Sequence, residues 1–247
     1  MALVAALALA TAVPQPDWLR LGTPETDGGG MTEALDALGS GPSVLVGFDP
    51  DLGTYAEVRP TVRALLGELL DRQAALTFVS LTAEGRALAI AERDRLERLA
   101  PDTGAPGDLG FVAGAEAALV DLAGSVSGQY DAIVVVGGND MGPRSWVEQV
   151  APRIDDVPLL VVTPVILLPE VRPYLATGQI DAGLVTPQEG ATYRAAVDPG
   201  GTAARSEGRE PSTLAILVGM LAAIAVLGYA LGARVTALGA ARPRDAG

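Results

Sequence analysis

The sequence predicts an α/β fold in which a doubly wound, mainly parallel β-sheet is followed by a C-terminal transmembrane helix. Between residues 43 and 197, short apolar runs alternate with longer amphipathic ones, a pattern typical of strands and helices in a parallel sheet. The run 131–136 holds five consecutive apolar residues, mostly β-branched, as expected of a central strand covered on both faces. Residues 213–233 carry no charge and are long enough to cross a bilayer.

Each element is assigned from the periodicity of its apolar residues. We expect strands at 44–48, 76–81, 109–112, 131–136, 159–163 and 182–186, and helices at 55–73, 83–99, 115–123, 146–154, 168–177 and 191–197. Pro60 falls in the first turns of the first of these helices, where proline is tolerated. Because crossovers are right-handed, we expect the strand order 3-2-1-4-5 with a sixth strand, in the flavodoxin or Rossmann manner.

The chain divides into six segments by composition. They are an apolar N-terminal signal or anchor segment (1–13), an extended lead-in (14–42), the α/β domain (43–197), a polar, Gly-rich linker (198–212), the transmembrane helix (213–233) and a cytoplasmic tail (234–247). The sequence therefore predicts one domain of ordinary size held at a membrane.

The membrane span is predicted from its length and its lack of polar residues. At 1.5 Å per residue, the run is ~31 Å long and matches the hydrocarbon thickness of a bilayer. A buried core helix would usually carry a polar stripe, whereas polarity here is limited to Thr213, Tyr229 and small residues. Gly228 and Gly232 form a pair that lets two helices pack closely in lipid, although glycine is also common in membrane helices generally.

The two ends of the chain suggest how it is oriented. The first thirteen residues are apolar but cover only ~20 Å, and the sequence 10–12 (Ala-Thr-Ala) resembles a signal-peptide cleavage site. A basic leader is missing, so the segment is either a signal peptide or part of a longer membrane helix, and both would export the α/β domain. The tail carries Arg234, Arg242 and Arg244 against Asp245, which places it in the cytoplasm and the main domain outside.

The composition excludes several kinds of chemistry. The chain has no Cys, no His and no Lys, so it cannot build a Ser-His-Asp triad, a thiol nucleophile, an ordinary zinc site or a P-loop lysine. Carboxylates, hydroxyls, arginines and a metal with oxygen ligands remain. The net charge of −13 should repel phosphate backbones, so we expect no nucleic-acid partner.

Ligands of such folds bind beyond the carboxyl ends of the strands, and polar residues gather at these predicted ends. The candidate ligand-binding residues are Asp49, Asp51, Thr54, Gly137, Gly138, Asn139, Asp140 and Thr163. Among them Asp49, Asp51 and Asp140 could hold Mg²⁺ or Ca²⁺ through oxygen ligands, although no cofactor is required by the sequence. The alternative interpretation is that Asp49 and Asp51 form a turn and an N-cap before the next helix.

The sequence Asp49-Pro50-Asp51, followed by Gly53-Thr54, resembles the DxDGT signature of the haloacid-dehalogenase-type phosphohydrolases. The resemblance implies that Asp49 is a phosphoryl-accepting nucleophile and Asp51 a general acid. It also implies that Ser80 or Thr82 supplies a hydroxyl and that Asp140 binds the metal. The sequence departs from the signature by the extra residue Leu52 and by the missing lysine.

The span 109–119, together with Thr163-Pro164 and the run 172–175, is similar to membrane-anchored α/β proteins of bacteria, a resemblance that brings no established activity with it. We therefore expect a structural or ligand-binding subunit of a membrane assembly, more readily than an enzyme. Its partners would be the lipid bilayer and a membrane protein or a second copy of the chain. The alternatives are a Mg²⁺-dependent phosphohydrolase that uses Asp49 and Asp51, and a small-molecule sensor that binds at 137–140.

Overall fold

The structure is a computed structural model that describes residues 30–101, 104–139, 141–154 and 157–197. Its strands form one six-stranded sheet in the order β3-β2-β1-β4-β5-β6. The strands are β1 (Ser43–Asp49), β2 (Ala75–Ser80), β3 (Gly107–Phe111), β4 (Ala132–Gly137), β5 (Leu159–Val162) and β6 (Ala182–Leu184). All five pairings are parallel, which confirms the predicted sheet and strand order.

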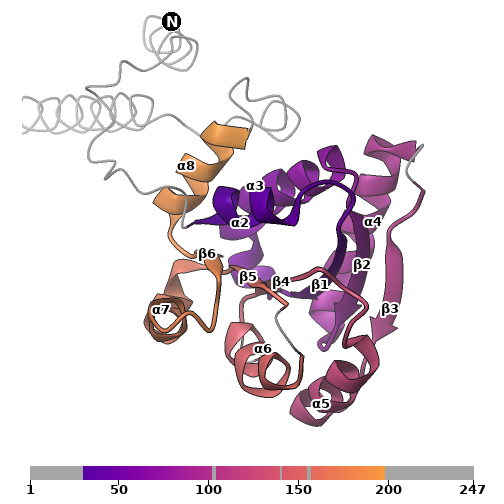
Figure 1. The fold of residues 1–247 in the computed structure, drawn as a ribbon, viewed down its shortest axis with the longest axis vertical. Coiled ribbons are helices and arrows are strands. Elements are labelled where there is room, and N and C mark those ends of the chain that lie inside the picture. Colours follow the sequence, from indigo (N-terminus) through magenta and orange to yellow (C-terminus); the bar gives the residue numbers. More distant parts are fainter. Residues whose placement is uncertain (1–29, 102–103, 140, 155–156, 198–247) are drawn as a thin grey trace, which may run out of the picture. The chain divides into compact units, whose positions relative to one another are not determined.

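Helices cover both faces of the sheet, as Figure 1 shows. They are α2 (Met31–Leu38), α3 (Leu52–Asp71), α4 (Ala83–Leu99), α5 (Ala115–Val126), α6 (Pro143–Gln149), α7 (Leu168–Ala176) and α8 (Pro187–Val197), with short 3-10 turns η3 (Ala151–Arg153) and η4 (Val165–Leu167). Residues of α2, α3, α4 and α8 form one apolar core with the sheet, and residues of α5, α6 and α7 form the other.

The strand order places a topological switch point between β1 and β4. The chain leaves β1 through α3 on one face of the sheet and leaves β4 through α6 on the other. The loops that follow these two strands therefore diverge, and in doubly wound folds such a divergence is where ligands bind. The fold thus brings the two loops that carry Asp49, Asp51, Gly138 and Asn139 to one place.

Residues 31–38 form a helix, whereas the sequence analysis assigned 14–42 to an extended lead-in. Met31 and Leu35 are one helical turn apart and both are fully buried, so the two side chains make an apolar stripe that packs on the core. Eight residues are too few for a stable isolated helix, so α2 depends on this packing.

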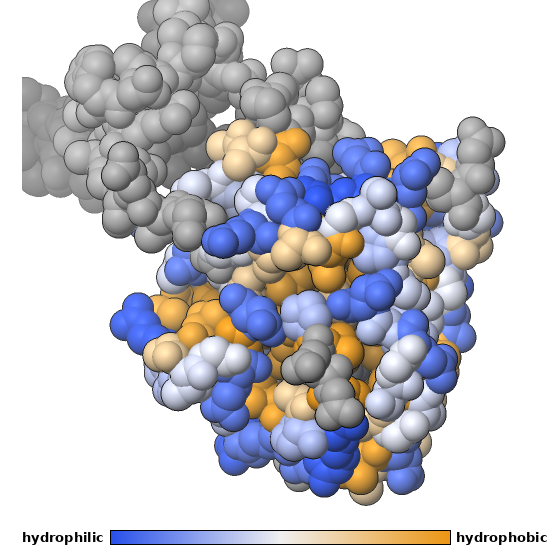
Figure 2. Space-filling view, in the orientation of Figure 1, coloured by the Kyte–Doolittle hydropathy of each residue, from blue (hydrophilic) through white to orange (hydrophobic). Residues whose placement is uncertain are grey.

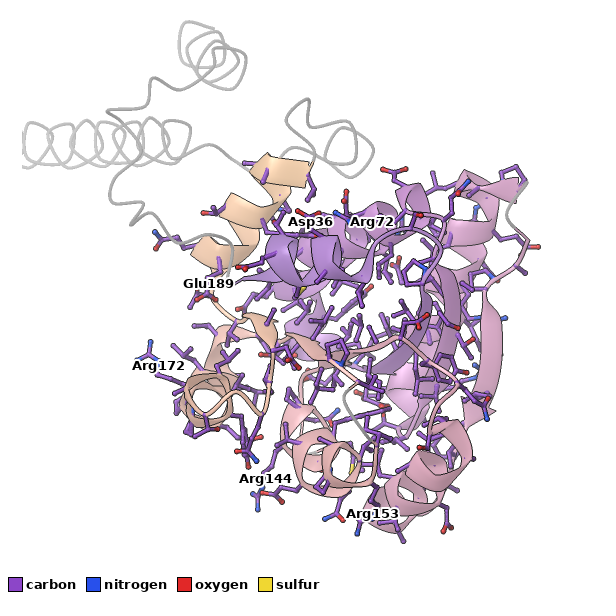
Figure 3. All side chains as sticks on the ribbon, in the orientation of Figure 1. Asp36, Arg72, Arg144, Arg153, Arg172 and Glu189 are labelled. Atoms are coloured by element: carbon purple, nitrogen blue, oxygen red, sulfur yellow. The ribbon has the colours of Figure 1, made fainter. Side chains whose placement is uncertain are left out.

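An ion pair ties α2 to the end of α3. Arg72 Nη2 lies 2.6 Å from Asp36 Oδ1, and the two side chains are labelled side by side in Figure 3. Arg72 Nη1 also donates to the Leu35 carbonyl oxygen at 2.9 Å. Arg72, which is 36 residues after Asp36, therefore fixes the position of α2 against α3.

Helix boundaries differ from the prediction where a cap or a proline begins the helix earlier. α3 begins at Leu52 because Asp51 caps it, so Pro60 lies in the helix interior and not in the first turns as expected. α6 begins at Pro143 and α8 at Pro187, since proline suits the first helical position.

The predicted membrane elements fall outside the described residues. These are the segment 1–13, the linker 198–212, the span 213–233 with Gly228 and Gly232, and the tail 234–247. Within the described part of the chain, no helix combines the length and the apolar character needed to cross a bilayer.

Candidate functional site

Asp49 ends β1 and links the β1–α3 turn to the β2–α4 turn. Its side chain is 1% exposed. Oδ1 accepts hydrogen bonds from the amides of Leu81 and Thr82, each at 2.8 Å, and from the Thr82 hydroxyl at 3.0 Å. Oδ2 is buried and has no hydrogen-bond partner among the described residues. Thus Oδ1 accepts three hydrogen bonds, whereas Oδ2 accepts none from the described residues.

Burial changes the acidity of Asp49. It raises the pKa of the carboxyl group from 3.8 to about 6, against the opposing effect of the hydrogen bonds from Leu81 and Thr82. The first turn of α4 presses on the same group, because a Cβ placed on Gly85 would overlap the Phe48 carbonyl oxygen and lie 2.6 Å from Asp49 Oδ1. Only glycine fits at position 85 without moving either the first turn of α4 or the end of β1.

Asp51 is the N-cap of α3. Its Oδ1 accepts the Thr54 amide at 2.9 Å and its Oδ2 accepts the Thr54 hydroxyl at 2.6 Å, as the capping interpretation predicts. The hydrogen bonds from Thr54 hold the pKa of Asp51 below its ordinary value. Both oxygens therefore have local partners and the group stays ionised at neutral pH.

The loop after β4 packs directly on the loop after β1. The Gly138 amide and Asn139 Nδ2 donate to the Asp49 carbonyl oxygen at 3.3 and 3.1 Å. A Cβ on Gly138 would lie 2.6 Å from Thr54 Oγ1 and 2.8 Å from Asp51 Oδ2. Gly137 is as closely packed, against the backbone of residue 142. The predicted site residues of these two loops that the structure describes thus lie together, but they contact one another and leave little space between the loops.

The proposed metal ligands receive no support from the part of the chain that the structure describes. No group of three or more acidic side chains there is arranged to hold a metal ion. Asp140, the third predicted ligand, lies outside the described residues. Asp51 gives both of its oxygens to Thr54.

Two further hydroxyls at the carboxyl edge are buried and unpaired among the described residues. Ser80 ends β2 and Thr163 follows β5, and neither Oγ atom has a hydrogen-bond partner there. Thr163 lines a small cavity of about 10 Å³ between α3, β5 and β6. Ser80 and Thr163 therefore share with Asp49 an unsatisfied polar atom at this edge of the sheet.

An exposed apolar surface at the same edge was not anticipated from the sequence. Three exposed apolar side chains lie after the ends of β1 and β5, Leu52 at the start of α3 and Val165 and Ile166 in η4, with exposures of 64%, 41% and 70%, and we call them together the carboxyl-edge rim. Glu57 of α3 joins its two loops, because its Oε1 accepts the Val165 amide at 2.8 Å. The apolar run after Pro164, inside a predicted loop, was the signal that could have identified it. Figure 2 shows apolar residues between polar ones on the face seen there.

A larger hollow lies at the opposite, amino edge of the sheet. It has a volume of about 560 Å³, is open to solvent and is lined by residues of α6, η3 and the starts of β5 and β6. Asp181 lies on the wall of this hollow. The Oδ2 atom of Asp181 accepts a hydrogen bond from the amide of Leu159, the first residue of β5, at 2.8 Å. This hollow therefore lies on the edge of the sheet opposite the switch point between β1 and β4.

A buried ion cluster between α3 and α4 stiffens the wall of the site. Glu92, 2% exposed, pairs with Arg63 at 2.7 Å and Arg95 at 2.6 Å and accepts the Tyr55 hydroxyl at 3.0 Å. Burial opposes its charged form, but the two arginines outweigh this, so the pKa of Glu92 is lowered. The cluster holds together the two helices whose N-termini flank Asp49.

Comparisons with known proteins do not assign the chain to a family. No family model and no curated protein matches it. One similar solved chain is described as "Structure of MT0777", with 15% identity and a TM-score of 0.38. The match covers 65% of this chain and 95% of that one.

Proposed function

We propose that the chain is a subunit of a membrane protein assembly. In this proposal the helix 213–233 anchors the α/β domain at the extracytoplasmic face, and the domain binds a partner protein through the carboxyl-edge rim. The observation that carries the proposal is the rim itself: three large apolar side chains stand in solvent where the strands end. Exposed apolar surface of this kind marks interaction sites.

The polar groups of the same edge support binding of a protein more than catalysis. Asp51 caps a helix with both of its oxygens, and Asp49 is 1% exposed. An aspartyl nucleophile must reach its substrate, and a small-molecule site usually offers at least ~300 Å³, far more than the cavity of about 10 Å³ at this edge. Binding through the apolar rim requires neither access to Asp49 nor a deep cavity.

Site-directed crosslinking of the full chain in membranes tests the proposal. The chain has no cysteine, so one introduced cysteine reports on its own position alone. We expect Ile166→Cys, labelled with a photoreactive maleimide, to crosslink to one defined protein. Leu99→Cys is the control, because Leu99 is 63% exposed but lies at the far end of α4. Equal crosslinking from both positions, or none from Ile166→Cys, would refute the rim as the binding surface.

Two accompanying measurements test the anchor and the main rival. Full-length protein should resist alkaline carbonate extraction from membranes, whereas a chain ending at residue 212 should be released. Mg²⁺-dependent hydrolysis of phosphate esters that disappears in Asp49→Asn would favour the phosphohydrolase alternative over our proposal.

A further inference from the structure

The cavity beside Thr163 is a partly open recess at the ends of β5 and β6. Its wall is formed by Glu57, Val58 and Thr61 of α3, by Val162 and Thr163, and by the segment 184–187. Its volume of about 10 Å³ is close to the smallest that admits one water molecule, ~10–15 Å³ on the same measure. Nothing larger than a water-sized molecule fits.

The wall carries an unsatisfied hydrogen-bonding group. Thr163 is 1% exposed, and its hydroxyl contacts no donor or acceptor among the described residues. An unpaired buried hydroxyl costs on the order of 1–3 kcal/mol, so native proteins usually supply a partner for it. The Thr163 amide is already bound to the Leu184 carbonyl oxygen at 3.2 Å.

Other polar groups on the wall can complete the coordination of a water molecule. The Thr61 side chain is buried, and Gly190 of α8 packs so closely on it that a Cβ there would lie 2.5 Å from Thr61 Oγ1. Glu57, an exposed residue at the mouth of the recess, offers a second carboxylate oxygen, since only its Oε1 is bound to the Val165 amide. A buried water usually makes two to four hydrogen bonds, and this wall provides a hydroxyl on each side and a carboxylate.

The loops around the cavity are held in place independently of its contents. Glu189, labelled at the start of α8 in Figure 3, accepts the amides of Val185 and Thr186 through Oε2, each at 2.9 Å. Glu57 holds the opposite loop through Val165. The cavity is therefore preformed and a water entering it does not have to order the chain.

We propose that this cavity binds one ordered water molecule that bridges the hydroxyl of Thr163 to Thr61 and Glu57. The water links α3 to the loop after β5, the same loop that carries Val165 and Ile166. The role of this water is to hold the loop after β5 in a fixed position relative to α3. The proposal does not depend on which molecule binds the rim.

Thermal unfolding of the full chain tests it through the sign of one substitution. Thr163→Val replaces the hydroxyl by a methyl group of similar volume. If the hydroxyl holds a water, the valine leaves that water or its other partners unpaired, and we expect the unfolding midpoint to fall by about 2–4 °C. Thr163→Ser, which keeps the hydroxyl, should retain the water. If the hydroxyl were unpaired, Thr163→Val would leave the midpoint unchanged or raise it, and this result would overturn the proposal.

A direct observation accompanies the stability test. A crystal structure of the full chain at better than about 1.8 Å should show one peak within roughly 2.7–3.0 Å of Thr163 Oγ1 that is absent in Thr163→Val. An empty cavity would overturn the proposal. So would a peak with oxygen contacts near about 2.4 Å, which would indicate a metal cation in place of water.

Discussion

Asp49→Asn should remove a pH dependence of stability that the buried carboxyl group imposes on the fold. Burial raises the pKa of Asp49 from 3.8 to about 6, so the folded state holds its proton more tightly than the unfolded chain does. For an acid whose pKa is raised by folding, stability is lost as the pH rises. The loss begins near the unfolded pKa and is complete above the folded one.

The magnitude follows from the two pKa values. A difference of about 2 units corresponds to roughly 3 kcal/mol when the pH is well above 6. Between pH 5 and pH 7.5 the same linkage gives a decrease of about 1.4 kcal/mol in the free energy of unfolding of the wild-type protein. Asparagine has no proton to lose and keeps an oxygen for Leu81 and Thr82, so the variant should lack this decrease.

Urea unfolding of both proteins at pH 5 and pH 7.5 measures the effect. The quantity to compare is the change between the two pH values, because the amide also leaves a buried donor unpaired and lowers stability at both. Carboxyl groups with lowered pKa values, such as Asp51, Glu92 and Asp108, act in the opposite direction but are common to both proteins. An identical pH dependence in the two proteins would show that Asp49 ionises in the fold as it does in the unfolded chain.

Three further substitutions test the packing of the site, each by urea unfolding of the full chain. Gly85→Ala should cost about 1–3 kcal/mol through overlap with the end of β1, whereas Gly67→Ala, whose Cβ meets nothing within 4 Å, should stabilise α3 by about 0.5–1 kcal/mol; equal effects would contradict the close approach. Asp51→Ala should cost about 1 kcal/mol at pH 7, and less as the pH falls and the wild-type carboxylate is protonated; a cost that grew on acidification would argue against the cap. Glu92→Ala should cost about 1.5–3 kcal/mol because it removes the buried acceptor that Arg63, Arg95 and the Tyr55 hydroxyl share, and a cost below ~1 kcal/mol would mean that water replaces the lost hydrogen bonds.

Local patterns were sufficient to predict the strands and most helices. The run 131–136 predicted β4 because a strand covered on both faces is apolar throughout and does not alternate apolar with polar residues. The amphipathic period of 83–99 predicted α4 with its observed bounds. α2 was missed because eight residues are a short stretch in which to recognise a helical period, although Met31, Leu35 and the partly buried Ala34 and Leu38 do follow one. Pro60 was placed in a first turn because the cap by Asp51 was only one of two interpretations of that residue.

The candidate site shows the same division. The sequence placed Asp49, Gly138 and Asn139 at neighbouring strand ends, and the structure does bring them into contact. The sequence could not show that these residues would hydrogen-bond to one another. Such bonds depend on distances between loops that are far apart in the sequence. The apolar run after Pro164 was a signal of the rim, but the exposure of Val165 and Ile166 depends on what packs above them, which the sequence does not show.

By itself, the sequence determined the parallel α/β architecture, because the period of apolar residues selects helix or strand and the right-handed crossover restricts their order. Only the tertiary structure decided the state of each polar group at the carboxyl edge. Asp49 meets Leu81 and Thr82 across 32 and 33 residues, and Glu57 meets the Val165 amide across 108. Burial, pairing and acidity depend on such distant neighbours, which are brought together only when the sheet forms.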